Sequence, residues 1–378
     1  MCDCGKKHIF LASPHMSEEK YEQAYVKEAF DTNWIAPLGE NVNRFEKEMS
    51  EKLGAKAATA LTTGTAAIHI GLKTLGVGKD DIVFCQSLTF SASANPIIYQ
   101  NAIPVFIDSD EDTWNMSPDA LERAFEKYPN VKAVIVVHLY GLSADMDRII
   151  DICNKHNVPI IEDSAESLGT TYKGKYTGTF GHLGIISFNG NKIITTSGGG
   201  MLLFNGENAE AEAKKARFWA TQSREPARHY QHSEIGYNYR MSNIVAGIGR
   251  GQLKVLDNRV EKKRYIYNYY EEHIGSLDGI ELMPMHEWSK SNCWLTAITL
   301  SDKVTPERLM NALEQANIES RPIWKPMHMQ PVFAGCDYID NGGVAQKIFE
   351  NGVCLPSDTK MTDEDLVRVC KEIRKLWL

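Results

Sequence analysis

The chain has 378 residues, of which 43% are hydrophobic and 24% are charged, a globular composition long enough for two domains. Its 41 Lys and Arg against 49 Asp and Glu give a net charge of −8, which argues against nonspecific binding to nucleic acid. No apolar run approaches the ~18 residues that a membrane span needs, and the start lacks the apolar core of a signal peptide. We therefore expect a cytoplasmic protein with no membrane span and no nucleic-acid partner.

Eight cysteines are scattered along the chain, which is typical of reduced thiols rather than of a disulfide framework. Cys2 and Cys4 stand close enough in the sequence to contact one metal ion. No second pair completes a zinc set, so we expect no metal site.

The predicted elements begin with short apolar runs that alternate with amphipathic stretches. The expected strands are 57–61, 82–85, 104–108, 133–138, 159–163, 184–188 and 201–204, and the helices between them include 65–75, 91–100, 118–128 and 145–157. Alternation of this kind predicts a mostly parallel sheet that is covered by helices on both faces. Such a sheet places ligands at the carboxyl ends of its strands.

The pattern changes in the last third of the chain. Residues 222–240 look irregular, and a long helical pattern follows over 243–273. The later expected elements are a strand at 293–300, a helix at 306–316, a strand at 318–323 and a closing helix at 363–377. We predict a large α/β domain over residues 1–250 and a smaller α+β domain over residues 251–378.

Two nucleotide-binding motifs are excluded. Residues 169–176 nearly match a P-loop, but Tyr176 stands where Ser or Thr would hold Mg²⁺, and no strand leads directly into the segment. We predict a turn-rich hairpin there. A G-x-G-x-x-G fingerprint after a first strand is also absent, which argues against a Rossmann dehydrogenase.

Three short motifs at the ends of predicted strands each allow an ordinary and a functional interpretation. Gly64 and Thr65 form either a capped helix start or a phosphate site. Asp163 is either an ordinary strand-end acid or a carboxylate that holds a cationic ring nitrogen. Lys192 lies between an apolar run and a glycine triplet, and is either an exposed turn lysine or a Schiff-base nucleophile.

The three motifs together are more specific than any one alone. A phosphate cradle, a carboxylate for a ring nitrogen and a lysine nucleophile are the parts that pyridoxal phosphate (PLP) requires. PLP is an electron sink only while its pyridine nitrogen stays protonated, and a paired aspartate ensures this. We therefore predict PLP as the cofactor.

Further motifs extend the pattern over nearly the whole chain. They are NWIAPLG at 33–39, TGTAA at 63–67, TF at 89–90, EDSAE at 162–166, SF at 187–188 with Lys192, GYNYRMS at 236–242, RP at 321–322 and KPMH at 325–328. On these residues the chain resembles the DegT/DnrJ/EryC1/StrS family of PLP-dependent nucleotide-sugar aminotransferases. The resemblance implies PLP fold type I, the aspartate aminotransferase fold: a large domain whose mostly parallel sheet is sandwiched by helices, and a smaller α+β domain.

The resemblance also implies roles for single residues. Lys192 is the lysine that joins PLP and carries the reacting proton, Asp163 pairs with the pyridine nitrogen, and Phe90 stacks on the ring. The implied phosphate contacts are Gly64, Thr65 and Ser187, with Asn238 reaching the phosphate of the neighbouring subunit. The candidate substrate contacts are Trp34, Arg240, Arg321, Lys325 and His328.

Two positions depart from the family pattern. Many relatives have Gln where this chain has Glu166, near the cofactor hydroxyl. Many also carry Gly-Asp where this chain has Gly181 and His182. The resemblance implies that Glu166 is a cofactor contact, while the effect of a carboxylate at that position and the role of His182 stay open.

The implied activity is transfer of the amino group of L-glutamate to a nucleotide-linked keto sugar, by a ping-pong mechanism, in a homodimer with shared active sites. Residues 189–198 resemble members that make 4-amino-4,6-dideoxy-N-acetylhexosamine nucleotides for glycan biosynthesis. We therefore expect UDP-4-keto-6-deoxy-N-acetylglucosamine as acceptor. A sugar dehydratase, in which histidine replaces the lysine, and a non-catalytic regulator that binds PLP or a sugar nucleotide stay open as alternatives.

Overall fold

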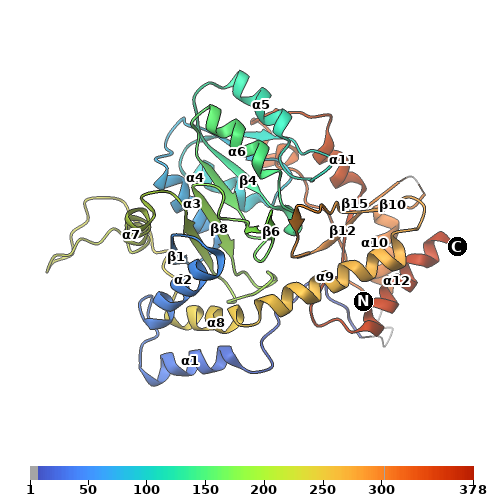
Figure 1. The fold of residues 1–378 in the computed structure, drawn as a ribbon, viewed down its shortest axis with the longest axis horizontal. Coiled ribbons are helices and arrows are strands. Elements are labelled where there is room, and N and C mark those ends of the chain that lie inside the picture. Colours follow the sequence, from blue (N-terminus) through green and yellow to red (C-terminus); the bar gives the residue numbers. More distant parts are fainter. Residues whose placement is uncertain (1–6, 302) are drawn as a thin grey trace.

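The computed structural model describes residues 7–301 and 303–378, and its centre is an eight-stranded sheet (Figure 1). In spatial order the strands are β1 (Ala57–Leu61), β9 (Gly200–Phe204), β8 (Leu183–Ser187), β5 (Ile160–Asp163), β4 (Val131–Val137), β2 (Ile82–Gln86), β3 (Ile103–Ile107) and β14 (Asp337–Ile339). The pairs from β8 through β14 are parallel, whereas β9 runs antiparallel to both β1 and β8.

Helices cover both faces of this sheet because alternate strand residues point to opposite sides. In β1, Ala57 and Leu61 belong to one hydrophobic cluster, and Ala58 and Ala60 to another. The first cluster includes side chains of α3 (Gly64–Thr74), α4 (Asn95–Tyr99) and α7 (Ala209–Ala220). The opposite face packs against α2 (Glu40–Leu53), α5 (Pro118–Lys127), α6 (Met146–Lys155) and α8 (Asn243–Leu253). Outside this layer, α1 (Tyr21–Asp31) packs on α8.

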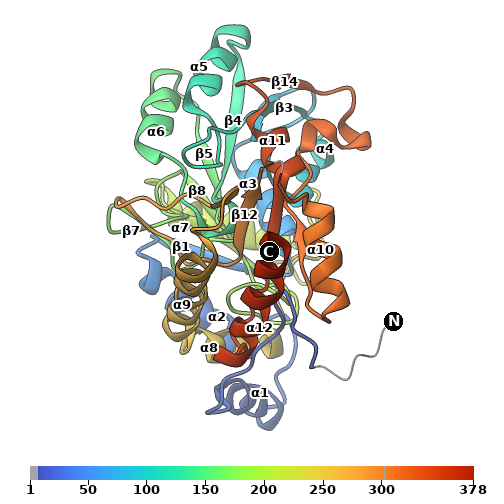
Figure 2. The same ribbon diagram turned by 90° about the vertical axis from the view of Figure 1, so that its right-hand side faces the viewer.

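A second sheet gathers most of the C-terminal part (Figure 2). Its strand order is β10 (Ile280–Leu282), β12 (Thr296–Leu300), β15 (Gly352–Leu355) and β13 (Arg321–Pro322). One hydrophobic cluster joins it to α9 (Leu256–Ile274), α10 (Pro306–Gln315) and α12 (Asp363–Arg374). The helix α11 (Val344–Asn351) leads into β15, and 3₁₀ turns occupy Ser91–Ser93, Leu139–Gly141, Met327–Met329, Pro331–Phe333 and Lys375–Trp377.

The predicted fold class is confirmed: a large, mostly parallel sheet lies between helices. The division into domains 1–250 and 251–378 stays a prediction. Its boundary falls inside α8, and β14 from the C-terminal part joins the large sheet.

Four predicted elements are wrong in extent. The helix predicted at 91–100 is a 3₁₀ turn at Ser91–Ser93 followed by the short helix α4 at Asn95–Tyr99. The pattern over 243–273 forms two helices, because Val255, with φ −109° and ψ 6°, interrupts the helical backbone. The strand predicted at 293–300 starts only at Thr296, since Cys293 has a left-handed φ of 50°. The strand predicted at 318–323 shortens to Arg321–Pro322, and Ile318 instead bridges to Ile9.

The segment that resembles a P-loop is a hairpin, as predicted. Its strands β6 (Thr171–Tyr172) and β7 (Lys175–Tyr176) pair antiparallel, and β11 (Ser289–Lys290) adds a third strand. The metal contact weighed for Cys2 and Cys4 lies outside the described residues. Among residues 7–301 and 303–378, no helix is both long and apolar enough to cross a membrane.

Candidate active site

One cavity of about 290 Å³ lies at the carboxyl ends of β5 and β8. It is lined by predicted site residues from distant parts of the chain: Gly64, Thr65, Phe90, Asp163, Glu166, Ser187 and Lys192. In a parallel sheet these strand ends share one edge, so the topology alone brings the loops after them together. The cavity residues of segment 63–192 are called the sheet wall below.

The N-terminus of α3 forms one end of the cavity. Thr63 is the N-cap, and its Oγ1 accepts a hydrogen bond from Ala66 N at 2.9 Å. A Cβ at position 64 would lie 3.2 Å from Ser187 Cβ, so glycine lets the helix start approach the end of β8 closely. A helix N-terminus with nearby hydroxyl groups is suited to bind a phosphate.

Asp163 is buried at the end of β5, and its carboxylate is fixed from two sides. Oδ2 accepts a hydrogen bond from Ser93 Oγ at 2.6 Å, and Oδ1 accepts one from Ala165 N at 3.1 Å. Ser93 Oγ also lies 2.7 Å from Thr89 Oγ1. The carboxylate is therefore oriented before any ligand binds.

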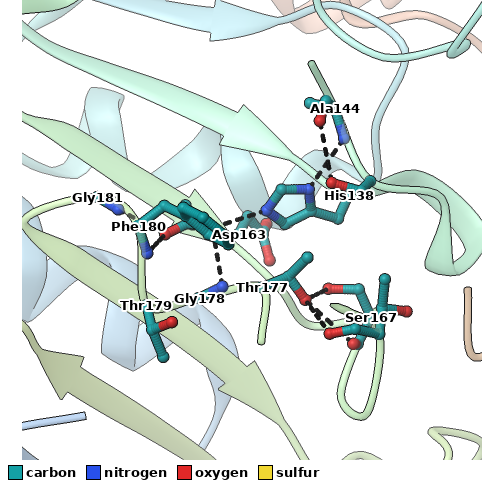
Figure 3. Close-up of polar contacts among 12 residues, drawn as sticks. His138, Ala144, Asp163, Ser167, Thr177, Gly178, Thr179, Phe180 and Gly181 are labelled. Carbon is teal, nitrogen blue, oxygen red and sulfur yellow. Dashed lines mark hydrogen bonds and ion pairs between the residues drawn. The ribbon is translucent and has the colours of Figure 1, made fainter. Parts of the chain in front are cut away.

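A network around the buried side chains of Glu162 and His138 supports β5 next to Asp163 (Figure 3). The Glu162 carboxylate accepts hydrogen bonds from His138 Nε2 and from the backbone N–H groups of Gly178, Phe180 and Gly181, at 2.6 to 2.9 Å. Ala144 N donates to His138 Nδ1 at 3.2 Å, so the ring proton is on Nε2. The network ties the strand that carries Asp163 to the segment that precedes β8.

Lys192 projects into the cavity from the loop after β8. Its Nζ lies 3.5 Å from Glu166 Oε1 and 3.9 Å from the centre of the Trp294 ring, and its side chain is only 12% exposed. Burial raises the pKa of Glu166, and the Lys192 ammonium opposes that rise. The amine is thus held between an anion and an aromatic face, inside the cavity.

Two tryptophans from the C-terminal part, Trp294 and Trp324, form the opposite side of the cavity, called here the distal wall. Trp324 Nε1 donates to Glu166 Oε1 at 3.3 Å, and Tyr140 N donates to Glu166 Oε2 at 2.8 Å. Sequence reasoning missed Trp294, Trp324 and Tyr140. Neither tryptophan stands at the end of a large-sheet strand, so no local pattern marks them.

The cavity residues fit PLP. The start of α3 suits an anionic phosphate, the fixed carboxylate of Asp163 suits a protonated ring nitrogen, and the Lys192 amine supplies a nucleophile. Phe90 lines the cavity and is 57% exposed, so its ring is free to pack on a planar ligand.

The other predicted contacts lie outside this cavity in the described chain. Asn238 is exposed, and Arg240 is buried with no hydrogen-bond partner for Nε among the described residues. Arg321 pairs with Glu319 at 2.9 Å. The remaining three are Trp34, which is 51% exposed, half-buried Lys325, and His328, whose Nδ1 lies 2.7 Å from Ser87 Oγ.

His182, which the sequence left without a role, lies just before the amino end of β8, whereas the cavity lies at the carboxyl end of that strand. Its Nε2 is 2.9 Å from Glu212 Oε1 on α7. The residue therefore joins α7 to the sheet and does not contact the cavity.

Comparisons with known proteins agree with this geometry. The DegT/DnrJ/EryC1/StrS aminotransferase family matches residues 16–374. EpsN of Bacillus subtilis (strain 168), which is provisionally named a PLP-dependent aminotransferase, is 55% identical over 98% of this chain and 96% of its own length. GDP-perosamine synthase of Escherichia coli O157:H7 is 35% identical over 98% of this chain and 99% of its own length.

A solved structure has the same fold. The aminotransferase TlmJ of Streptoalloteichus hindustanus superposes with a TM-score of 0.89 at 28% identity, covering 97% of this chain and 98% of its own. The family and the cofactor predicted from the sequence are confirmed. The chain belongs to the DegT/DnrJ/EryC1/StrS aminotransferase family and is a PLP-dependent sugar aminotransferase.

Proposed function

We propose that this enzyme transfers the amino group of L-glutamate to a nucleotide-linked 4-keto-6-deoxy sugar, with UDP-4-keto-6-deoxy-N-acetylglucosamine as the acceptor. One observation carries the proposal: the Lys192 amine, the Asp163 carboxylate and the N-terminus of α3 surround a single cavity. Bound there, PLP supplies an electron sink.

Each part of the sheet wall has a task in this reaction. The N-terminus of α3 and Ser187 hold the phosphate, and Asp163 keeps the proton on the ring nitrogen. Lys192 anchors the cofactor until the amino donor displaces it. Its freed Nζ then takes the proton from the α carbon of glutamate and later returns a proton to the sugar carbon.

Glu166 has a role beside Lys192 in this proposal. Its carboxylate lies 3.5 Å from Lys192 Nζ and stabilises the charged amine by an ion pair. Trp324 and the Tyr140 backbone hold Glu166 in place. Glu166 thus keeps the lysine aligned when it is not bonded to the cofactor.

The presence of Lys192 also separates this activity from the alternatives. A dehydratase of this family replaces the lysine with histidine, which cannot anchor the cofactor covalently. A non-catalytic regulator needs no amine held against a carboxylate in a cavity, so both alternatives are disfavoured.

A second copy of the chain completes the site in this proposal. Large apolar side chains are exposed on two segments: Phe30, Trp34, Ile35 and Leu38 on one, and Tyr230 and Ile235 on the other. The second segment belongs to the loop that extends away from the body beyond α7 (Figure 1). Exposed apolar groups of this size favour burial against a partner. Asn238 follows the same loop, where it can reach the partner's phosphate.

In this proposal the nucleotide of the acceptor contacts cationic groups that lie outside the cavity, Arg240, Arg321 and Lys325, called here the outer cations. Arg321 and Lys325 can bind a diphosphate by charge-assisted hydrogen bonds, and the buried guanidinium of Arg240 is suited to an anion. The name of the Escherichia coli relative includes a GDP-linked sugar, so the experiment below compares acceptors that carry UDP with acceptors that carry GDP.

The test uses the two half-reactions separately. Loaded enzyme is treated with L-glutamate, freed of small molecules, and mixed with 4-keto sugars linked to UDP or GDP and with a 3-keto analogue. We expect the PLP absorbance to return fastest with the UDP-linked 4-keto sugar. No return with any keto sugar would contradict the proposal, and a faster return with the GDP or 3-keto compound would overturn the acceptor assignment.

A further inference from the structure

A second buried lysine lies directly behind the cavity. Lys263, on α9, is only 4% exposed, and its helix neighbours Ile266 and Tyr267 are buried apolar residues. Taking an ammonium group out of water is costly unless it has partners. Lys263 is thus a buried titratable group for which the reaction described above has no use.

The amine of Lys263 is directed at the backbone of the distal wall. Its Nζ donates a hydrogen bond to the Trp294 carbonyl oxygen at 2.8 Å. The indole of the same Trp294 lies against Lys192, with 3.9 Å between Lys192 Nζ and the ring centre. Trp294 Nε1 donates in turn to Asn191 O at 2.8 Å, so Trp294 also holds the backbone beside Lys192.

A second, small cavity of about 10 Å³ is lined by both lysines. Its lining includes both lysine side chains, together with Thr195, Gln252 and Asp358. The space is about that of one probe sphere and is lined by groups that donate and accept hydrogen bonds. Lys192 and Lys263 therefore line one small polar cavity and both contact Trp294.

We propose that Lys263 is a positioning residue for Lys192: it fixes Trp294 against the Lys192 amine and places a second positive charge behind it. This inference depends on the role proposed above for Lys192. Lys263 holds the Trp294 carbonyl, and the Trp294 indole in turn contacts the Lys192 amine. The charge of Lys263 acts on Lys192 across the small polar cavity.

The charge of Lys263 depends on pH in the range where the enzyme would operate. Burial lowers its pKa to about 8, and the Asp358 and Cys293 side chains oppose that shift. The titratable or charged side chains that face it or line the shared cavity are Asp358, Cys293, His15 and Lys192. Below pH 8 Lys263 is cationic and disfavours a second positive charge on the Lys192 nitrogen.

The test follows the visible absorbance of the full-length loaded protein between pH 5.5 and 10, which reports the proton on the Lys192 nitrogen. Lys263→Met keeps the length of the side chain but removes its charge and its hydrogen bond. The spectral midpoint should move upward by roughly half a pH unit or more, because a cation is lost while Asp358 remains. The kcat should fall about tenfold, with KM for glutamate within about twofold.

The matched control is Lys262→Met, the neighbouring helix lysine, which packs on Tyr265 instead. We expect its midpoint and kcat to equal those of the wild type. A Lys263→Met protein with a lowered melting temperature but an unchanged midpoint would reduce Lys263 to a structural residue and overturn the proposal. Equal shifts in both variants would overturn it too.

Lys263→Gln keeps a donor for the Trp294 carbonyl without the charge, and serves if Lys263→Met does not fold. It should show the same upward midpoint with a smaller loss of kcat. An unchanged midpoint in Lys263→Gln would contradict the role proposed for Lys263 but not the role proposed for Lys192. A wild-type protein without a pH-dependent band, or a Lys192→Ala protein that keeps one, would instead contradict the role of Lys192.

Discussion

The two walls of the cavity differ in how they are built. The cavity residues of the sheet wall lie at the ends of strands, in the loops that follow them or in the first turns of α3, so short-range sequence fixes their place on the sheet edge. The distal wall comes from Trp294 and Trp324, more than a hundred residues beyond Lys192, and holds Glu166 and Lys192 by side-chain contacts. We infer that the sheet wall carries the chemistry common to this family, whereas the distal wall and the outer cations adjust it.

The largest effect should follow loss of the amine on the sheet wall. Lys192→Ala should lose more than about a thousandfold in kcat, since both the anchor and the proton carrier are removed. Its melting temperature should stay near that of the wild type, because the Lys192 amine projects into a cavity rather than into the hydrophobic core. Lys214→Ala, at an exposed position of α7, is the control. Wild-type turnover by Lys192→Ala would refute the assignment.

Loss of the carboxylate should have the next largest effect. Asp163→Asn keeps the shape of the side chain and its contact with Ser93, but does not hold a proton on the ring nitrogen. The kcat should fall by about two to three orders of magnitude, with a much smaller change in thermal stability. An unchanged kcat would show that Asp163 is an ordinary strand-end acid.

The outer cations predict a dependence of activity on the nucleotide. If Arg321 and Lys325 bind the diphosphate, the free keto sugar should have a kcat/KM about a hundredfold below that of its UDP form, from two charge-assisted hydrogen bonds. Steady-state kinetics with both acceptors measures the ratio. Equal kcat/KM values for the two acceptors would show that the nucleotide does not contribute to recognition.

Asn238 tests whether the active site is shared between two chains. Asn238→Asp should weaken PLP binding, because a carboxylate would face the phosphate. When Asn238→Asp and Lys192→Ala subunits exchange, roughly half the dimers are mixed and each has one complete site, so activity should recover to about a quarter of wild type. A tagged-subunit pulldown confirms exchange. Activity equal to the sum of the separate variants, despite exchange, would contradict the shared site.

The smallest effect should come from Glu166, where the two walls meet. Burial raises the folded-state pKa of this carboxyl, so the folded protein binds the proton more tightly than the unfolded chain does. The contribution of Glu166 to the free energy of unfolding therefore falls as pH rises from about 4.5 through the folded-state pKa. Glu166→Gln should remove that fall and change kcat by less than about fivefold. Urea unfolding at pH 5 and pH 7.5 measures it. A steeper fall in the variant would contradict this assignment.

The sequence predicted the sheet wall because its signals are local. Thr63 to Thr65, Asp163 and Lys192 each adjoin an apolar strand pattern, and parallel topology then brings them together. The distal wall depends on how α9 and the loop before β12 pack against that sheet. Cys293, with its left-handed backbone, turns Trp294 toward Lys192, and the apolar pattern there predicted only a strand. For the same reason Lys263 had no signal: its role depends on a carbonyl thirty-one residues away.

The most direct measurement identifies the lysine that holds the cofactor. The loaded protein is reduced with borohydride, digested, and its peptides are analysed by mass spectrometry. The account predicts that the mass of the reduced cofactor is found on Lys192, with Lys263 unmodified although both amines lie within one buried region. Cofactor on Lys263, or on no lysine, would contradict the site described for this enzyme.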